Sequence, residues 1–334
     1  MSTVVGTEHI HTYWSNALEP VVWVEPGETV VVETLDSSYG RMAREVESLA
    51  QPGIDPELLA LITSAAYPER STADRDPALP RGHALTGPVG VVGAEPGDLL
   101  SVEIVRVEPA AWGHTSASSD PARLGLLNDY LDETGSYQHF WDLRDGTAAM
   151  LKPGVRVPLA PFCGVMGVAP AEPGQHSTIP PRRFGGNLDL RHLTDGSTLR
   201  LPVMAPGALL SVGDAHAAQG DGEVSGTGIE MDAVVTLRLD VLKGGGAAGP
   251  SAFTSGAPLS IPGPCHVGIG CDPDLREAAR AALRGTLDYL VSERGLTPRE
   301  AYVLCSVCVD LKLSQVVDMP NYTVGSYLPL AVFD

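Results

Sequence analysis

Acidic residues, a histidine and many glycines are concentrated in the stretch from Gly185 to Glu230. Within it, Gly213-Asp214-Ala215-His216 ends an apolar run typical of a strand, and Gln219-Gly220-Asp221-Gly222-Glu223 follows directly. Aspartate, glutamate and histidine are common ligands of metal ions, and glycine lets the backbone approach a ligand closely. This composition predicts a metal site, although a surface turn without a function could have the same composition.

Four residues are the predicted metal ligands. Asp214 and His216 are separated by one residue, so in a continuing strand their side chains face the same side. Asp189 follows a Gly-Gly-Asn turn, and Asp36 closes the first pair of predicted strands. The spacing does not identify the metal; zinc is the first choice, and calcium and manganese remain open. For Asp36 and Asp189, the competing interpretation is an aspartate that only forms a turn.

Three further residues are predicted to act in proton transfer or in contact with a substrate. Glu223 lies on a glycine-rich loop that could aim its carboxylate at the metal, with Asp221 as its competitor. Glu230 is either a catalytic residue, a metal ligand or a support for one. His83 lies on a Pro- and Gly-rich segment that the fold could bring to the site, and the same holds for His176.

A serine or cysteine nucleophile is the alternative to a metal. The sequence has no G-x-S-x-G motif, the strand-to-helix turn that presents a nucleophilic serine. Cys163 lies between apolar residues in PFCGVMG, which favours a buried core thiol over a nucleophile. The metal route is therefore preferred.

Several segments carry a resemblance to a known family: Leu18–Asp36, Thr86–Val102, Pro161–Pro170, the run GDAHAAQGDGE and the later DLKLSQVVDMPN. On these segments the chain resembles the acetamidase/formamidase family over nearly its whole length. The resemblance implies hydrolysis of a short amide, such as formamide or acetamide, to a carboxylate and ammonia. Two alternatives stay open: a metal-stabilised protein that binds a small ligand without turnover, and a hydrolase of another C–N bond, as in urea or a carbamate.

A repeated unit of strand, Pro-Gly turn and strand predicts the fold. It occurs at Val21–Leu35, at Pro88–Val107 and at Leu201–Val212. We interpret these units as hairpins of a β-barrel or β-sandwich. The segment Ala110–Ala148 alternates polar and aromatic residues without a clear period, and we interpret it as an insertion packed on the strands.

The helices are expected mainly near the C-terminus. An apolar stripe predicts a helix capped by Asp272 and ending at Gly295, and Thr297 starts a capping box for the next. Shorter helices are expected at Arg41–Leu49 and Asp55–Ala65, and strands at Asp310–Val317 and Tyr327–Phe333. The predicted fold is α+β, mostly β, as a single unit: residues 1–243 are mainly β, and 244–334 form a helical segment packed on them.

Composition restricts the partners. The 334 residues include 22 basic and 41 acidic ones, so the net charge of −19 argues against nucleic acid and anionic membranes as partners. No secretory signal is recognisable, and the five cysteines form no disulfide framework, with Cys305 and Cys308 interpreted as buried thiols. We expect a cytoplasmic protein, a small-molecule substrate and a homo-oligomer.

Overall fold

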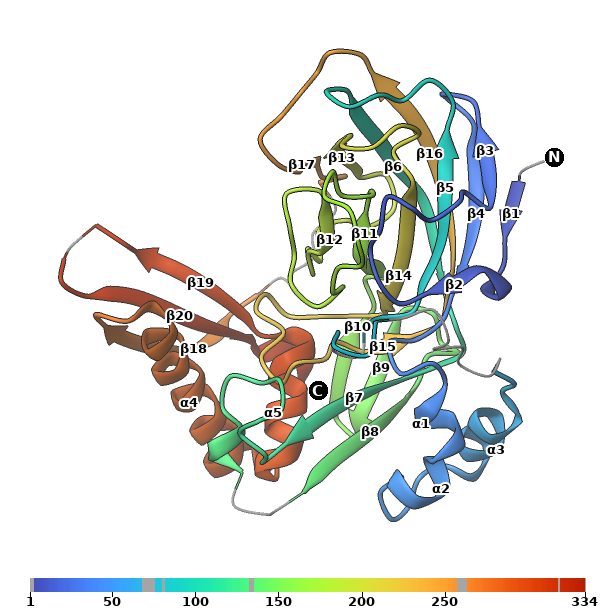
Figure 1. The fold of residues 1–334 in the computed structure, drawn as a ribbon. Helices are drawn as coiled ribbons and strands as arrows, with labels where there is room; N and C mark the ends of the chain where they lie inside the picture. Colours follow the sequence, from blue (N-terminus) through green and yellow to red (C-terminus); the bar gives the residue numbers. More distant parts are fainter. Residues whose placement is uncertain are drawn as a thin grey trace.

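Strands dominate the computed structural model, which describes residues 3–67, 76–79, 82–131, 135–256, 263–317 and 319–333. Two large sheets form a sandwich (Figure 1). Val30 and Val32 of one sheet and Leu210 and Val212 of the other belong to the same buried cluster. The strand-rich prediction is confirmed as a sandwich, and the barrel alternative is not: the smaller sheet is open, with β1 and β17 at its edges.

The smaller of the two sheets has six strands in a row. In spatial order they are β1 (Thr3–Val5), β4 (Thr29–Thr34), β16 (Ala233–Leu242), β6 (Leu99–Pro109), β13 (Thr198–Pro202) and β17 (Ser251–Phe253). The larger sheet has nine strands: β12 (Gly185–Asn187), β11 (Phe162–Gly167), β14 (Leu210–His216), β15 (Glu230–Met231), β7 (Trp112–Ser118), β8 (Ser136–Asp142), β5 (Leu85–Val91), β2 (Ile10–His11) and β3 (Val22–Val24). A separate ribbon pairs β9 (Ala148–Lys152) with β10 (Val155–Pro158).

The three Pro-Gly units are not hairpins, which corrects the prediction. β3 pairs with β5 in the nine-stranded sheet, whereas β4, which follows it, pairs with β1 and β16 in the six-stranded sheet. The connections from β5 to β6 and from β13 to β14 also cross between the sheets. An arch between two sheets and a hairpin within one sheet both bury every second side chain, so the hydrophobic pattern does not distinguish them.

The segment Ala110–Ala148 is part of the nine-stranded sheet and not an insertion. β7 and β8 pair in antiparallel register, with His114 opposite Phe140. β7 also pairs with β15, where His114 lies opposite Glu230. Six of the seven residues of β7 are buried, so its two faces do not differ in polarity and no two-residue period appears. This strand brings Glu230 into the sheet.

The C-terminal helices agree with the prediction at most of their ends. α4 (Leu275–Arg294) ends at Gly295, whose φ of 64° is left-handed, and α5 (Pro298–Cys308) begins with the capping box of Thr297 and Glu300. The N-cap of α4 is Asp274 and not Asp272, because the Asp274 side chain accepts the N–H groups of Arg276 and Glu277. Asp272 is the last residue of a strand.

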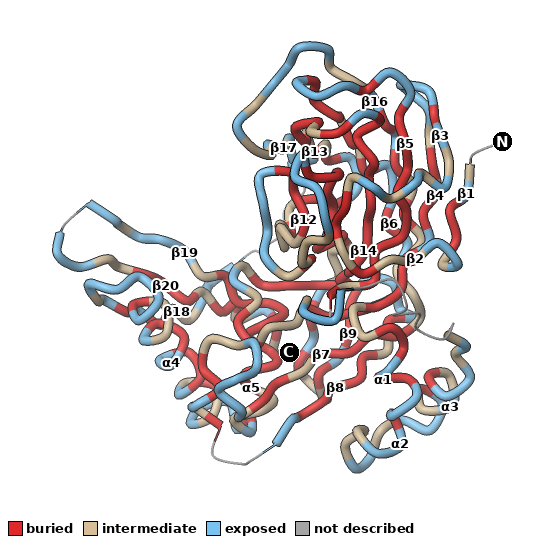
Figure 2. Tube along the Cα trace, in the orientation of Figure 1, coloured by how far each residue is buried: buried red, intermediate tan, exposed pale blue. Residues whose placement is uncertain are grey.

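The segment 244–334 holds more strand than predicted. A three-stranded sheet contains β18 (Cys265–Asp272), β20 (Tyr322–Pro329) and β19 (Asp310–Gln315), and α4 packs against β18 and β20. The last strand therefore begins and ends earlier than the predicted Tyr327–Phe333. Figure 2 shows α5 largely buried, and Cys305 and Cys308 on it are buried free thiols, as predicted.

Three short helices follow β4. The predicted helix at Arg41–Leu49 is split at Glu45 into α1 (Arg41–Arg44) and α2 (Val46–Leu49). α3 (Pro56–Ser64) has Asp55 as its N-cap and proline in its first turn, as predicted.

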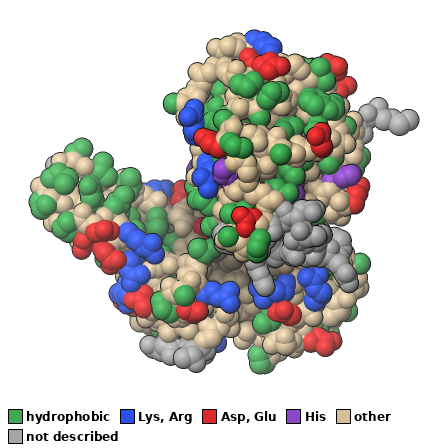
Figure 3. Space-filling view, in the orientation of Figure 1, with side chains coloured by type: hydrophobic (Ala, Val, Ile, Leu, Met, Phe, Trp, Pro, Cys, Tyr) green, Lys and Arg blue, Asp and Glu red, His purple; other side chains and the backbone are tan. Residues whose placement is uncertain are grey.

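The surface of the three-stranded sheet carries apolar side chains at its outer end (Figure 3). Ile269, Leu313, Val317 and Met319 are each at least 60% exposed. Among the helices in the described part of the chain, none is both long and apolar enough to cross a membrane.

Candidate active site

Asp214 and His216 end the central strand β14, and both are buried in the sandwich. The neighbouring strand β11 contributes Gly164 beside them. A Cβ atom on Gly164 would lie 2.6 Å from Asp189 Oδ1 and 3.0 Å from Asp214 Oδ2. Only glycine leaves room for both carboxylates here, so Gly164 allows Asp189 and Asp214 to come together.

Three acidic residues of this region have a left-handed backbone. The φ angles are 45° at Asp189, 55° at Asp214 and 43° at Glu223. This conformation costs a residue with a side chain about 1 kcal/mol or more, and such strain is often found at functional sites. The fold therefore holds these three residues in an unfavourable backbone conformation, which fixes the directions of their carboxylates.

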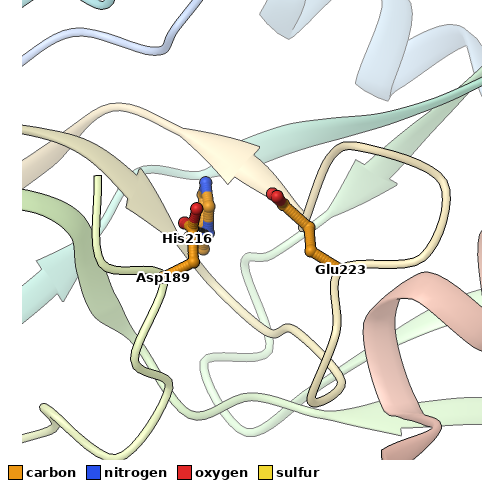
Figure 4. Close-up of side chains that lie close together, drawn as sticks. All are labelled: Asp189, His216 and Glu223. Carbon is orange, nitrogen blue, oxygen red and sulfur yellow. Dashed lines mark ion pairs between the residues drawn. The ribbon is translucent and has the colours of Figure 1, made fainter. Parts of the chain in front are cut away.

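Carboxylates surround the His216 imidazole. Its Nε2 lies 3.0 Å from Glu230 Oε1 and 3.6 Å from Asp214 Oδ1, and its Nδ1 lies 4.0 Å from Asp189 Oδ1. The carboxylate of Glu223 points toward Asp189 and His216 (Figure 4). Two overlapping groups, Asp189–His216–Glu223 and Asp214–His216–Glu230, each bring their potential ligand atoms within 4.8 Å of one another.

Gln219 fixes which nitrogen of His216 carries the proton. The Gln219 amide Nε2 donates to the backbone carbonyl of Asp189 at 3.2 Å, so its Oε1 must face His216. That oxygen lies 2.7 Å from His216 Nδ1, which therefore donates. In the neutral ring, the lone pair of Nε2 then points toward Glu230 and Asp214.

Glu230 is oriented by the protein through both carboxylate oxygens. Ser37 Oγ donates to Oε2 at 2.6 Å, and the backbone N–H of Gly228 donates to Oε1 at 3.0 Å. A Cβ atom on Gly228 would lie 2.9 Å from the His216 ring, so glycine is needed there as well.

His83 reaches the same group from the segment before β5. Its Nε2 lies 3.8 Å from Asp214 Oδ2. Thr178 holds it from the other side: the threonine Oγ1 accepts the His83 backbone N–H at 2.8 Å and lies 3.0 Å from His83 Nδ1. The structure thus brings together six of the seven predicted residues: His83, Asp189, Asp214, His216, Glu223 and Glu230.

Two buried polar atoms of the site lack a hydrogen-bond partner among the described residues. His216 Nε2 and Asp189 Oδ1 are buried atoms with no hydrogen-bond partner in the described part of the chain. Burial lowers the pKa of His216, but the carboxylates of Glu230 and Asp214 outweigh it and hold the pKa well above its usual value. Burial, with Asp214 and Glu230 adding repulsion, raises the pKa of Asp189 to about 7. Such a site favours a positive charge among its carboxylates.

Two further carboxyl groups of the site, those of Glu223 and Asp214, have pKa values shifted in opposite directions. Burial raises the pKa of Glu223 well above its usual value, and the negative charge of Asp189 adds to this. Burial also acts to raise the pKa of Asp214, but His83 and His216 reverse the effect and hold it below its usual value. Carboxyl groups with pKa values moved apart can serve different chemical roles.

A cavity of about 550 Å³ opens onto this group. Asp189, Asp214, Glu223 and Glu230 line it, together with His83. Its volume lies in the range of small-molecule sites.

Asp36 lies in a different cluster. Its Oδ1 and Oδ2 accept the backbone N–H groups of Ser38 and Gly40 at 2.7 and 2.8 Å, and Oδ1 lies 3.4 Å from His114 Nε2. The physical reason is the arch between the sheets: β4, which precedes Asp36, belongs to the six-stranded sheet, whereas β14 belongs to the other. The prediction assumed two similar hairpins with Asp36 and Asp214 at the same level, and these hairpins do not form.

The other candidates also lie outside the group. His176 Nε2 faces the Glu172 carbonyl at 3.2 Å, and Asp221 contacts Asp310 through its backbone N–H. Cys163 is buried, and burial raises the pKa of its thiol to about 12, which favours the unreactive protonated form.

Sequence reasoning gave no role to the residues that hold the site together: Ser37, Gly164, Thr178 and Gln219. Gln219 alone carried a signal, since it follows His216 by three positions in the glycine-rich run. The other three come from distant segments, and only the fold brings them near.

Known proteins resemble this chain in sequence and in fold. The chain is 26% identical to a formamidase of Methylophilus methylotrophus, covering 97% of this chain and 89% of the relative. It is 29% identical to an acetamidase of Mycolicibacterium smegmatis over 69% of this chain and 74% of the relative. The fold is similar to that of a gamma lactamase from Delftia acidovorans, with a TM-score of 0.79, 27% identity and coverage of 98% and 90%. The model of the acetamidase/formamidase family matches residues 65–176 and 174–334, so this chain belongs to that family.

Proposed function

We propose that this protein hydrolyses the C–N bond of small linear amides with the help of a divalent metal ion. Membership of the family supports an amide hydrolase. The observation that carries the metal is His216 Nε2, a buried nitrogen without a hydrogen-bond partner that faces the carboxylates of Glu230 and Asp214. A lone pair and two carboxylates repel each other unless a cation lies between them or the ring is protonated.

The donor atoms present suit such an ion. Asp214, His216 and Glu230 would hold it, with Asp189 as a further carboxylate near the same imidazole. Glu230 is a ligand in this proposal because Ser37 and Gly228 already fix it 3.0 Å from His216. One imidazole with several carboxylates fits zinc as the first choice, and manganese or calcium as alternatives. A divalent ion there supplies a water of lowered pKa and polarises the amide carbonyl.

Glu223 is the proposed proton carrier. Hydrolysis of an amide requires a group that takes a proton from the attacking water and gives one to the departing nitrogen. Burial and the charge of Asp189 raise the Glu223 pKa, so its carboxylate accepts a proton more readily than a solvated one. Its glycine-rich loop and left-handed backbone aim it at the cavity.

His83 is the proposed donor to the carbonyl oxygen. Thr178 Oγ1 already accepts the His83 backbone N–H, and its own hydrogen is free to face His83 Nδ1. That arrangement leaves the proton on Nε2, which lies on the side of Asp214 and the cavity. An N–H group there would stabilise negative charge on the oxygen of the tetrahedral intermediate.

Release of ammonia from formamide, acetamide, urea and a carbamate tests the proposal. We expect turnover of the linear amides, its loss after treatment with a chelator, and its return with zinc, manganese or calcium. Full activity in metal-free protein would contradict the metal mechanism and leave amide hydrolysis standing. Binding of amides without any turnover by the metal-loaded protein would favour the binding-protein alternative.

A cyclic amide is a second candidate substrate. The TM-score is 0.79 to a gamma lactamase and 0.62 to a predicted acetamidase/formamidase of Thermoanaerobacter tengcongensis, which supports testing a γ-lactam as a substrate. Opening a γ-lactam releases no ammonia, so the amino-acid product must be followed by chromatography.

A further inference from the structure

We name the cavity lined by Asp189, Asp214, Glu223 and Glu230 the carboxylate cavity. It adjoins a second cavity of about 320 Å³. Six serines are among the residues that line the second one, which we name the serine cavity: Ser37, Ser38, Ser116, Ser118, Ser136 and Ser225. Ser37, Ser38, Arg41, Arg123 and Thr227 line both cavities. One bound molecule can therefore touch both.

The two cavities share Arg41 and Arg123 but differ in their acidic residues. Five acidic residues line the carboxylate cavity, whereas the described lining of the serine cavity contains Arg41, Arg123 and His114 but no Asp or Glu. The chain as a whole has 41 acidic and 22 basic residues, so a lining of this kind runs against its composition. The hydroxyls of Ser37 and Ser225 already donate to Glu230 Oε2 and to the Ser116 carbonyl. The serine cavity still favours an anion over a cation, since guanidinium groups and the other hydroxyls donate hydrogen bonds and no described carboxylate competes for them.

Arg123 is the basic group best placed to bind one. In the described part of the chain, no carboxylate lies within ion-pair distance of its guanidinium, whereas Arg41 already pairs with Glu45 at 3.2 Å. Guanidinium groups bind carboxylates in a bidentate manner, which makes such a contact selective.

Formamide and acetamide are too small to reach both cavities at once. The combined volume of the two cavities exceeds the volume of either molecule. We propose, resting on the function proposed above, that the preferred substrates are short linear amides with a carboxylate at the other end of the acyl chain. The amide lies in the carboxylate cavity beside His83 and Glu223. The acyl chain passes Thr227, and its carboxylate binds Arg123 among the hydroxyls of the serine cavity.

The test compares amides of matched length with and without the carboxylate: malonamate and succinamate against propionamide and butyramide. With the metal-loaded protein we expect kcat/KM to be about tenfold or more higher for the carboxylated amides, since a charge-assisted contact is involved. Raising the ionic strength should reduce this preference, because Arg123 is exposed to solvent.

Arg123→Gln should reduce the ratio of kcat/KM between carboxylated and neutral amides about tenfold or more. Arg276→Gln, at an exposed arginine on α4, is the matched control and should leave that ratio unchanged. The inference is overturned if the wild type prefers neutral amides, or if Arg123→Gln leaves the ratio as it was.

Calorimetric binding separates this inference from the function on which it rests. Succinamate should bind the wild type more tightly than butyramide does, and Arg123→Gln should remove that difference, whether or not turnover occurs. Binding with this preference but without turnover would refute the proposed function and support the anion site. Turnover of acetamide with no preference for succinamate in either assay would support the proposed function and refute the anion site.

Discussion

Two buried clusters of aspartate and histidine lie in this sandwich, and they differ in how far the protein satisfies them. In the cluster of Asp36, His114 and Asp232, the oxygens of Asp36 accept two backbone N–H groups. Tyr67 donates to Asp232 Oδ2 at 2.9 Å, and the backbone N–H of Asp36 donates to Asp232 Oδ1 at 2.7 Å. Only His114 Nδ1 is without a partner there among the described residues.

The cluster of Asp189, Asp214, His216, Glu223 and Glu230 is the opposite case. It holds four carboxyl groups around one imidazole, and two of its buried atoms have no partner. The first cluster fixes the loop after β4, whereas the second leaves two buried polar atoms without a partner among the described residues. Both clusters contain aspartate and histidine, so they differ instead in how many buried polar atoms lack a partner: one in the first and two in the second, among the described residues.

We expect the largest effect on turnover from replacing Glu223, the proposed proton carrier. Glu223→Gln removes the proposed proton carrier but keeps the size of the side chain, and we expect turnover to fall by a factor on the order of 10²–10⁴. Metal content and the circular dichroism spectrum should stay unchanged. The neighbouring Asp221→Asn is the matched control and should cost much less. Near-normal turnover in Glu223→Gln would remove this role.

Stability in the metal-free protein should separate the clusters next. Asp36→Ala leaves two N–H groups and His114 without their acceptor, so the free energy of unfolding should fall by about 3 kcal/mol. Asp189→Asn should have the opposite sign, because it removes one repelling carboxylate and asparagine tolerates the left-handed backbone at this position. Urea denaturation of both variants measures this. Equal destabilisation by the two substitutions would mean that the clusters are equally well satisfied.

A partly buried histidine, His11, sharpens the comparison with His216. His11 Nδ1 donates to the Tyr13 carbonyl, and its Nε2 accepts from Ser211 Oγ, each at 2.8 Å. Burial lowers the His11 pKa to about 4, so between this value and 6.5 the unfolded chain binds more protons than the folded protein. Stability is therefore complete above the unfolded pKa and is lost as the pH falls.

From about pH 7 to about pH 5, this loss should be on the order of 2 kcal/mol from His11 alone. His11→Gln should flatten the dependence of the unfolding free energy on pH by that amount. An unchanged slope in the variant would show that His11 is not held neutral.

Local signals predicted much of the fold. The capping box at Thr297 and the end of α4 at Gly295 follow from rules that operate within one turn of a helix, and both are confirmed. The partners of the strands could not be predicted in this way. Val21–Val24 and Thr29–Leu35 show the same alternation whether they pair with each other or lie in different sheets, and the structure chooses the second.

The candidate site shows the same limit. Asp214, His216 and Glu223 lie close together in the sequence, so their composition was enough to select them. Asp36 was selected on an assumed hairpin, and the arch between the sheets places it elsewhere. Glu230 reaches His216 only because β15 lies between β14 and β7, and β7 shows no period that would identify it as a strand.

Metal content per chain tests the central claim most directly, because it does not depend on knowing the substrate. Elemental analysis of folded protein should find a divalent metal in stoichiometric amount in the wild type and in Asp36→Ala. It should be lost from Asp214→Ala and His216→Ala. Retention of the metal in both of these variants, or its loss from folded Asp36→Ala, would contradict the assignment of the metal to the cluster of carboxylates around His216.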